Sequence, residues 1–339
     1  MRGLGISYDT GFVVHGANSR PQFDPAAVDR DLRAIRDDLH CTAVRVMGGD
    51  PDRIAYAAAR AADLGLAVWF SPYPLEATED EMLALFADCA ERAEKLRAGG
   101  AEVVFVAGAE HSLMNPGFLP GGTTEERLAG LFAGPAAVRE LIPRVAVRIN
   151  DFLGRALTVV RERFAGPVTY AAIQFERVDW TPFDILSMDL YRNSGVADQF
   201  AAGVRTLVAQ GKPVAVTEFG SATFRGAGDL GARGLEVVEH DPVTRAPVRL
   251  SGVYERDEPG QAAYVRELLE IFDAAGVDSA FVFTFALSSY PHRPDGDPRD
   301  DLDLASYSIV RLREDGAWEP KAAFHAVAAY YEGRQAGNG

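Results

Sequence analysis

Short apolar runs rich in Val, Ile and Phe alternate along the chain with segments that have helical periodicity. Continuous apolar runs of this length are typical of strands that are buried on both faces of a parallel sheet. The segments between them carry apolar residues three and four positions apart, which is the spacing of one face of a helix. The strand-like runs are residues 4–8, 43–47, 66–70, 103–107, 168–173, 185–190, 214–217 and 280–285.

Capping signals mark where several of the intervening helices begin. Asp24-Pro25 and Asp50-Pro51 each place a capping carboxylate before a proline in the first helical turn. Thr78, with Glu81 three residues later, has the spacing of a capping box. We therefore expect a helix after each of the first three strands. Further helical patterns reach to about residue 164, span roughly 196–209, and include residues 264–272 and 323–330.

Eight strands alternating with helices predict an α/β protein with a single (β/α)8 TIM barrel. A doubly wound open sheet is the rival fold, but it usually has fewer strands and a glycine-rich first turn. The first turn here, Tyr8-Asp9-Thr10-Gly11, lacks that pattern. Long loops are expected after strands 4 and 7, over residues 113–123 and 219–256. Since no linker or repeat divides the chain, we expect one barrel domain over residues 1–335 and a flexible tail over 336–339.

Composition narrows the class of partner. The chain has 339 residues, with 34 Lys and Arg against 49 Asp and Glu, so its formal net charge is −15. No basic patch is evident, so we do not expect nucleic acid as a partner. No run approaches the roughly 18 apolar residues of a membrane span, and no signal peptide is evident, which predicts a cytoplasmic protein. Cys41 and Cys89 are not spaced as zinc ligands, and no metal or cofactor is expected.

Polar residues at the carboxyl ends of the strands are the candidates for chemistry, because the active site of such a barrel lies at that face. Glu110 follows the fourth strand and Glu218 follows the seventh, on nearly opposite walls of an eight-membered ring. Two facing carboxyl groups suit glycoside hydrolysis, in which one protonates the leaving oxygen and the other attacks the sugar or activates water. The residues expected to bind the substrate are Tyr8, Asp9, Arg45, His111, Gln174, Glu176, Trp180, Asp189 and Tyr191.

The segment Thr217-Glu218-Phe219-Gly220 after the seventh strand, with a glutamate after the fourth, resembles the clan A glycoside hydrolase superfamily. The resemblance implies that Glu110 is the general acid/base and Glu218 the nucleophile of a retaining glycosidase. It also implies that Tyr191 bonds the nucleophile and that Arg45 lies beside it. The partner is then a small-molecule or oligosaccharide substrate. Relatives of this kind in actinobacterial genomes are labelled abortive infection proteins, a label that implies phage defence.

Two positions depart from the family pattern. Ala109 stands where the family usually has an asparagine that holds the 2-hydroxyl group of the sugar. The eighth strand is expected to end at Phe285-Ala286-Leu287, without the tryptophan that often lies under the sugar ring. These departures leave open a barrel that binds a carbohydrate or another ligand without hydrolysing it, including a role in phage defence. A lyase or isomerase reaction is a third alternative, for which no convincing metal-ligand cluster is evident.

Two loops carry further expectations. Five aspartates lie within residues 291–303, but their spacing does not match an EF-hand, so we expect a solvated acidic loop rather than a calcium site. The glycine-rich segment within 219–256 is expected to be a mobile loop over the mouth of the barrel, where it could act as a lid.

Overall fold

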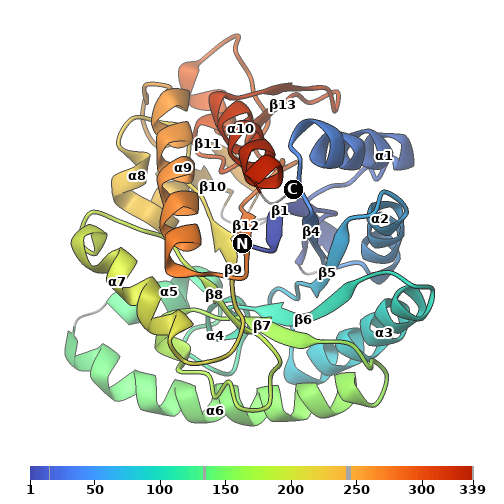
Figure 1. Cartoon of the computed structure of the whole chain (residues 1–339). Coiled ribbons are helices and arrows are strands. Elements are labelled where there is room, and N and C mark those ends of the chain that lie inside the picture. The colour runs from blue at the N-terminus through green and yellow to red at the C-terminus, as the bar shows by residue number, and fades with distance from the viewer. Residues whose placement is uncertain (15, 133–134, 242–245, 338–339) are drawn as a thin grey trace. The chain divides into compact units, whose positions relative to one another are not determined.

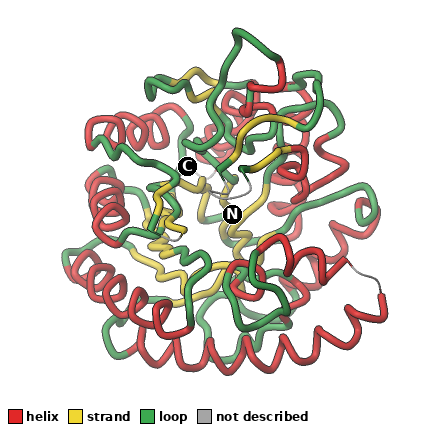
Figure 2. The backbone as a smooth tube through the Cα atoms, turned by 180° about the vertical axis from the view of Figure 1, so that it is seen from behind, coloured by secondary structure: helices red, strands yellow, loops and turns green. Residues whose placement is uncertain are grey.

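The structure is a computed structural model that describes residues 1–14, 16–132, 135–241 and 246–337. Eight parallel strands alternate with helices and form one (β/α)8 barrel, as the sequence predicts (Figure 1). Figure 2 shows the same alternation of strand and helix along the backbone. The barrel strands are β1 (Gly3–Asp9), β4 (Ala43–Gly48), β5 (Ala67–Pro72), β6 (Val103–Ala109), β7 (Val168–Ala171), β8 (Leu186–Asp189), β9 (Val214–Phe219) and β12 (Ser279–Val282).

The helices begin where the capping signals place them. The Asp24 side chain accepts a hydrogen bond from the Ala26 N–H, and Thr78 and Glu81 form the expected capping box. The last helix runs to Gly337, so it includes part of the expected tail over 336–339; residues 338 and 339 lie outside the described residues. Helix α10 (Ala322–Gly337) follows the last barrel strand, and other helices lie between barrel strands along the chain. These include α1 (Pro25–Arg33), α2 (Pro51–Asp63), α3 (Glu79–Ala98), α6 (Pro135–Arg161), α7 (Ala197–Val208) and α9 (Glu258–Ala275).

The chain divides into two compact units, each of which has its own parallel strand pairs. Unit 1 comprises residues 1–9, 24–44 and 190–339, and unit 2 comprises residues 10–23 and 45–189. In unit 1, β12 pairs with both β1 and β9. In unit 2, β6 pairs with both β5 and β7. Each strand trio is buried, which explains why its sequence is apolar without alternation.

Aromatic side chains fill much of the space between strands and helices within each unit. In unit 1, Phe219 of β9 packs edge-to-face on Phe272 of α9, with ring centroids 5.0 Å apart. Helix α10 lies beside α9 in the same unit (Figure 1). In unit 2, Phe86 of α3 contacts Phe105 of β6 and Phe152 of α6. The predicted helical faces are therefore the buried ones.

Both expected long loops are present, and both contain short secondary structure. After β6 the chain forms α4 (His111–Met114) and α5 (Thr124–Phe132) before α6 begins. After β9 it forms α8 (Ala227–Leu230), a 3-10 helix (Gly231–Val237) and the strand pair β10 (Val238–His240) and β11 (Pro247–Leu250). Residues 242–245 of this loop lie outside the described residues. Small two-stranded sheets are also formed by β2 (Val13–Val14) with β3 (Ala17–Asn18), and by β13 (Val310–Leu312) with β14 (Trp318–Pro320).

The loop after β9 has a hydrophobic core of its own. Phe224, Val238 and Leu250 are buried in one cluster with Leu304 and Tyr307 from the segment after β12. Ala227, within the glycine-rich part of the loop, is buried in the same cluster, so that part packs on other residues of unit 1.

The eighth barrel strand ends three residues earlier than the sequence pattern predicts. β12 stops at Val282, and the Phe283–Thr284 peptide bond that follows is cis. Beyond it the chain leaves β9: the Phe285 N–H and the Thr284 hydroxyl both donate hydrogen bonds to the Ser7 carbonyl. The apolar run in the sequence is longer than the strand because Phe285, which follows the end of the strand, is also buried. Phe283, rather than Phe285, is therefore the aromatic residue at the end of the strand.

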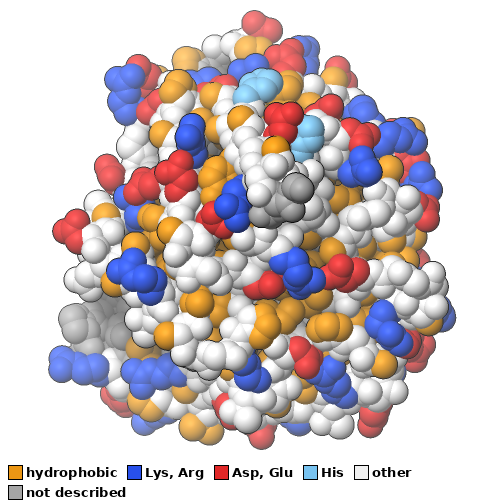
Figure 3. Space-filling model, viewed as in Figure 1, with side chains coloured by type: hydrophobic (Ala, Val, Ile, Leu, Met, Phe, Trp, Pro, Cys, Tyr) orange, Lys and Arg blue, Asp and Glu red, His pale blue; other side chains and the backbone are white. Residues whose placement is uncertain are grey.

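The surface carries mixed charges. Acidic and basic side chains are interspersed over the face shown in Figure 3, without a large area of one sign. Many of them pair with each other, as Arg92 does with Asp88 and Asp52. Among the helices of the described ranges, none combines the length and the apolar content that a membrane span requires.

Candidate active site

Glu110 lies directly after β6, at a point where the strand pairing becomes irregular. The register of β6 against β7 shifts between Val106 and Ala109, and such a bulge re-aims the residues that follow it. The Glu110 backbone is left-handed, with φ 45° and ψ 39°, and its side chain is half-buried. A non-glycine residue in this conformation costs roughly 1 kcal/mol or more, so the surrounding contacts must hold it there.

Glycine is required two residues before Glu110. Gly108 has φ +79°, and a Cβ atom at this position would lie only 2.2 Å from Cε1 of the His111 ring. The chain therefore folds back tightly onto the His111 ring just before Glu110.

His111 supports this turn from the interior of unit 2. Its Nε2 lies 2.9 Å from the Ala107 carbonyl oxygen and its Nδ1 lies 3.1 Å from the Asn115 amide nitrogen. Because a carbonyl only accepts, Nε2 carries the proton and Nδ1 accepts from Asn115. Burial lowers the pKa of His111 to about 4, despite the opposing hydrogen bond to Ala107, so the ring is neutral near pH 7. The ring has no exposed surface, which contradicts the expected substrate contact.

Glu176 is the second buried group in this region. Its carboxyl group accepts hydrogen bonds from the Ser112 hydroxyl at 2.7 Å and from the Tyr170 hydroxyl at 3.0 Å. Burial raises the pKa of Glu176 to about 7, although the bonds from Ser112, Ile173 and Tyr170 oppose the shift. Glu176 has no exposed surface either, so the expected substrate contact is replaced by a contact with the start of α4.

Glu218 belongs to unit 1 and is still part of strand β9. Its carboxylate Oε2 accepts a hydrogen bond from the Tyr191 hydroxyl at 3.2 Å, and its backbone oxygen accepts one from the Leu190 N–H at 2.8 Å. The side chain is only 5% exposed. Gly220, two residues on, lies so close to the end of β12 that a Cβ atom would be 2.3 Å from the Phe283 carbonyl oxygen.

Three aromatic rings lie together in the same part of unit 1. Tyr191 packs edge-to-face on Tyr307, with ring centroids 5.8 Å apart, and Phe283 packs on Tyr307 at 6.0 Å. The Phe283 N–H donates to the Phe219 carbonyl, which places Phe283 beside the residue that follows Glu218. Sequence reasoning missed Phe283 because it ended the strand too late, and nothing in the sequence pointed to Tyr307.

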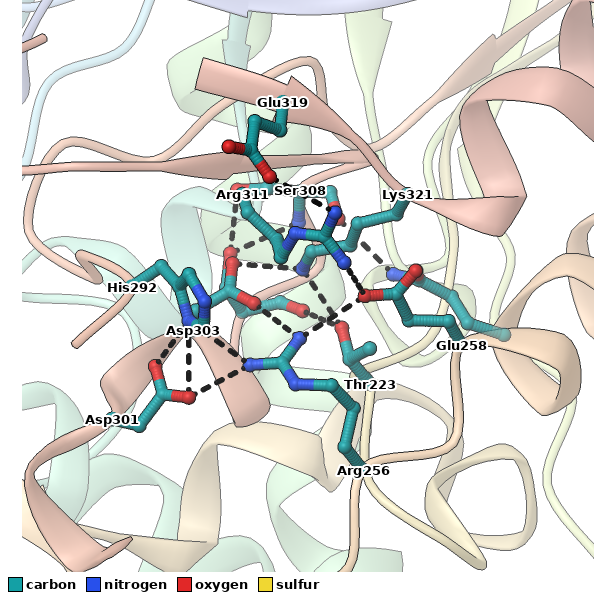
Figure 4. Close-up of polar contacts among 12 residues, drawn as sticks. Thr223, Arg256, Glu258, His292, Asp301, Asp303, Ser308, Arg311, Glu319 and Lys321 are labelled. Atoms are coloured by element: carbon teal, nitrogen blue, oxygen red, sulfur yellow. Dashed lines mark hydrogen bonds and ion pairs between the residues drawn. The ribbon is translucent and has the colours of Figure 1, made fainter. Parts of the chain in front are cut away.

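A network of ion pairs joins the segment that carries Tyr307 to the loop after β9 (Figure 4). Asp303 is fully buried and pairs with Lys321 at 2.8 Å and with Arg256 at 2.7 Å. Arg256 also reaches Asp301 at 2.8 Å, and the Lys321 ammonium donates to the Thr223 hydroxyl at 2.9 Å. The expectation of a solvated acidic loop is therefore wrong for Asp301 and Asp303, because both are buried against basic partners.

The same network contains the one group of possible metal ligands found among the described residues. Ligand atoms of His292, Asp301 and Asp303 all lie within 4.8 Å of one another. The Arg256 guanidinium already contacts all three, at 2.8 Å from Asp301, 2.7 Å from Asp303 and 3.3 Å from His292. These carboxylates are thus balanced by side-chain cations, and the geometry is that of an ion-pair network.

Tyr8 and Asp9 are the expected site residues on β1. The Tyr8 hydroxyl donates to Asp31 of α1 at 3.0 Å, and the Trp318 indole N–H donates to the same carboxylate at 2.8 Å. Tyr8 is buried, and its hydroxyl links the strand to its helix layer. Asp9 ends β1 and is 3% exposed.

The remaining expected site residues belong to unit 2. Arg45 is buried in β4, where its Nε donates to the Ser71 hydroxyl at 3.1 Å and its guanidinium lies over the Tyr73 ring. Trp180 is half-buried and packs on Phe183, with ring centroids 5.4 Å apart. Asp189 is the buried last residue of β8, and Gln174 is exposed in a 3-10 helix (Gln174–Glu176) that follows β7.

Comparison with solved structures identifies proteins of similar fold. No family model matches the chain, and no curated protein does either. A GH113 β-1,4-mannanase structure matches with a TM-score of 0.62 at 15% identity, over 97% of this chain and 98% of that one. The fold of this chain is therefore similar to that of a glycoside hydrolase with a (β/α)8 barrel.

Two further structures agree with this fold. A β-glucosidase mutant derived from a hyperthermophilic tetrameric structure has a TM-score of 0.55 at 9% identity, over 96% of this chain and 94% of that one. Thermotoga maritima Cel5A in complex with cellobiose has a TM-score of 0.51 at 12% identity, over 89% of this chain and 96% of that one. At such identities the similarity shows the fold alone, so an activity must be argued from this chain's own side chains.

Proposed function

We propose that the chain is a retaining glycosidase in which Glu218 is the nucleophile and Glu110 the general acid/base. The observation that carries the proposal is the hydrogen bond from the Tyr191 hydroxyl to Glu218 Oε2, at the end of the seventh barrel strand. A phenol that donates to a carboxylate stabilises its ionised form and fixes its orientation. An ionised, oriented carboxylate is what a glycosidase nucleophile requires.

The proposed reaction has two steps. In the first, Glu218 attacks the anomeric carbon while Glu110 donates its proton to the leaving oxygen, which gives a covalent glycosyl-enzyme. In the second, Glu110 takes a proton from water, and the resulting attack on the anomeric carbon releases the sugar and restores Glu218. The fixed left-handed turn of Glu110 supports this role, because proton transfer depends on a constant donor position.

Phe283 is the proposed platform for the sugar ring. Its side chain is half-buried, and it follows β12 directly, beside the strand that carries Glu218. The face of an aromatic ring is an apolar surface on which the C–H groups of a sugar ring can pack. Phe283 thus offers an aromatic side chain at the end of the eighth strand, where the family often has a tryptophan.

Aryl glycosides test the proposal, beginning with the β-mannoside and the β-glucoside. The wild-type chain should hydrolyse at least one member of the panel with retention at the anomeric carbon. Glu218→Gln should lower kcat by roughly 10³-fold or more, and Glu110→Gln should do so for poor leaving groups. Glu102→Gln is the matched control, because Glu102 is exposed just before β6 begins. Full activity of the Glu218→Gln variant would remove Glu218 from the mechanism.

A second candidate is a barrel that binds a carbohydrate without cleaving it. Ala109 favours it, since this residue is the fully buried last residue of β6 and offers no amide to a sugar hydroxyl. In that case oligosaccharides would bind in calorimetry and be recovered intact, and Glu218→Gln would bind them as tightly as the wild type.

A further inference from the structure

Tyr170 and Glu176 contact the turn that carries Glu110, although neither was expected to act on it. Tyr170 lies on β7, and Glu176 ends the short 3-10 helix that follows β7. Both side chains have no exposed surface, so neither can contact a substrate. Any effect they have on the reaction must therefore pass through other residues of unit 2.

Three successive backbone N–H groups at the turn are bonded to this one segment. The Glu110 N–H donates to the Ala171 carbonyl at 2.9 Å. The His111 N–H donates to the Tyr170 hydroxyl oxygen at 2.7 Å. The Ser112 N–H donates to Glu176 Oε1 at 3.0 Å. N–H groups at the start of a helix have no partner within the helix, so these bonds fix where α4 begins and hold Glu110 in its left-handed conformation.

The two side chains also bond to each other. The Tyr170 hydroxyl accepts from His111 and donates to the Glu176 carboxylate, with both oxygens at 3.0 Å. The Ser112 hydroxyl donates to the same carboxylate at 2.7 Å. Glu176 therefore sets the direction of the Tyr170 hydroxyl proton, and removing its charge would disturb both ends of the turn.

The partners of Glu176 in the described part of the chain are uncharged. They are the Ser112 hydroxyl and N–H, the Tyr170 hydroxyl and the Ile173 N–H, at distances from 2.7 to 3.2 Å. Helix α6 packs on the same 3-10 helix and contributes the amide of Asn150, which donates to the Arg177 carbonyl. His111, the nearest basic side chain of the turn, is neutral near pH 7. Among the described residues, the groups that hydrogen-bond to the Glu176 carboxyl group are therefore all uncharged.

The charges of the two carboxylates act on Tyr170. The pKa of Tyr170 is raised well above its usual value, first by burial, then by the charge of Glu176, and further by the charge of Glu110. The phenol therefore keeps its proton near neutral pH and continues to donate to Glu176.

We infer that Glu176 is a positioning residue for Glu110: through Ser112 and Tyr170 it fixes the left-handed turn from which Glu110 acts. The inference rests on the proposed role of Glu110 as acid/base, and it adds a reason for the identity of a buried carboxyl group that no substrate reaches.

Two variants and one matched control test the inference. Glu176→Gln keeps the size of the side chain but removes the charge and places an amide against the donors. Tyr170→Phe removes the hydroxyl that lies between His111 and Glu176. Thr169→Val is the control, because Thr169 is equally buried on β7 but bonds to Ile185 and Ser187 instead. Each variant is assayed on aryl glycosides with good and with poor leaving groups across pH 5–9.

Glu176→Gln should lower kcat about 10–100-fold on poor leaving groups and about threefold or less on good ones, since only the former need acid catalysis. Tyr170→Phe should show the same dependence on the leaving group more weakly, and Thr169→Val should not show it. Equal losses on good and poor leaving groups in Glu176→Gln would overturn the inference.

A second readout does not depend on activity. The backbone amide resonances of residues 110–112 should move in Glu176→Gln and Tyr170→Phe, and remain in place in Thr169→Val. If the wild type hydrolyses no glycoside, the proposed function fails, while these resonances still decide whether Glu176 holds the turn. Unchanged resonances in Glu176→Gln would contradict the positioning role whatever the activity.

Discussion

The two candidate carboxyl groups are held by different kinds of interaction. Glu110 lies in a left-handed turn whose N–H groups are bonded to buried, uncharged donors and acceptors and to one buried carboxyl group, Glu176. Glu218 lies in an extended strand, bonds to Tyr191, and belongs to a unit whose loops are joined by ion pairs. An acid must stay protonated and a nucleophile ionised, so two unlike environments are what the proposed pair of roles requires.

The difference also appears in how the two regions respond to pH. Burial raises the pKa of Glu176 from 4.5 to about 7, so the folded protein binds this proton more tightly than the unfolded chain does. The folded protein therefore loses stability as the pH rises through that interval. Burial would also raise the pKa of Asp301, but hydrogen bonds, the first from the Arg293 N–H, and the Arg256 charge hold it below its usual value. Asp301 therefore contributes stability that is lost as pH falls through its unfolded and then its folded pKa.

The largest predicted effect is in the ion-pair network. Asp303→Asn leaves the buried ammonium of Lys321 and the guanidinium of Arg256 without their shared carboxylate, which should cost about 3–5 kcal/mol of unfolding free energy. Urea unfolding measures the loss. Asp297→Asn serves as the control, since Asp297 pairs with Arg299 at the exposed surface and its removal should not move the midpoint. If both variants unfold at the wild-type midpoint, the network does not hold the loops of unit 1.

The next effect is the pH dependence in the Glu110 region. The shift of Glu176 from 4.5 to about 7 corresponds to about 3 kcal/mol at most, so Glu176→Gln should gain that much stability relative to the wild type between pH 4.5 and 7.5. Urea midpoints at several pH values measure the difference. For Thr169→Val, the difference in unfolding free energy from the wild type should not change with pH. If the difference for Glu176→Gln does not change with pH either, the carboxyl group is not buried as described.

A smaller effect is expected from the hydroxyl that bonds to Glu218. Tyr191→Phe should lower kcat/KM on aryl glycosides about 10–100-fold, because a hydrogen bond to an ionised group contributes about 1.5–3 kcal/mol. Tyr264→Phe is the control from the same unit, since that hydroxyl donates to the Arg192 carbonyl instead. Equal losses in the two variants would remove the Tyr191 contact from the mechanism.

The smallest effect concerns the proposed sugar platform. Phe283→Ala should raise KM about 5–10-fold with little change in kcat, since an aromatic contact contributes about 0.5–1.5 kcal/mol. Phe283→Tyr should retain most of the affinity. The same measurement on Trp180→Ala compares the residue found at the end of β12 with the one that the sequence favoured. An effect only at Trp180 would move the platform from unit 1 to unit 2.

The barrel could be predicted from the sequence because its strands are buried on both faces and its helices are capped locally. The end of β12 could not, since the apolar run continues to Phe285 although the strand ends at Val282. Local patterns show how polar and apolar residues alternate, but they do not show where a neighbouring strand stops.

The candidate site was predictable in outline only. The expected ends of the strands were enough to select Glu110 and Glu218. The direction of the other side chains at these ends depends on the local backbone, including the irregular pairing of β6 with β7, which the sequence does not show. Tyr8 instead bonds to Asp31 behind its strand, and His111 turns into the interior under Gly108. The partners of Asp301 and Asp303 were equally hidden, because Arg256 lies 45 and 47 residues earlier in the chain.

The most direct test of the central claim is covalent trapping of the nucleophile. The wild-type chain is incubated with activated 2-deoxy-2-fluoro glycosides of the sugars that it hydrolyses, and intact and peptide masses are recorded. The account predicts one glycosyl adduct per chain, on the peptide that contains Glu218, and no adduct in Glu218→Gln. An adduct on another residue, or hydrolysis of the parent glycosides without any adduct at Glu218, would contradict it.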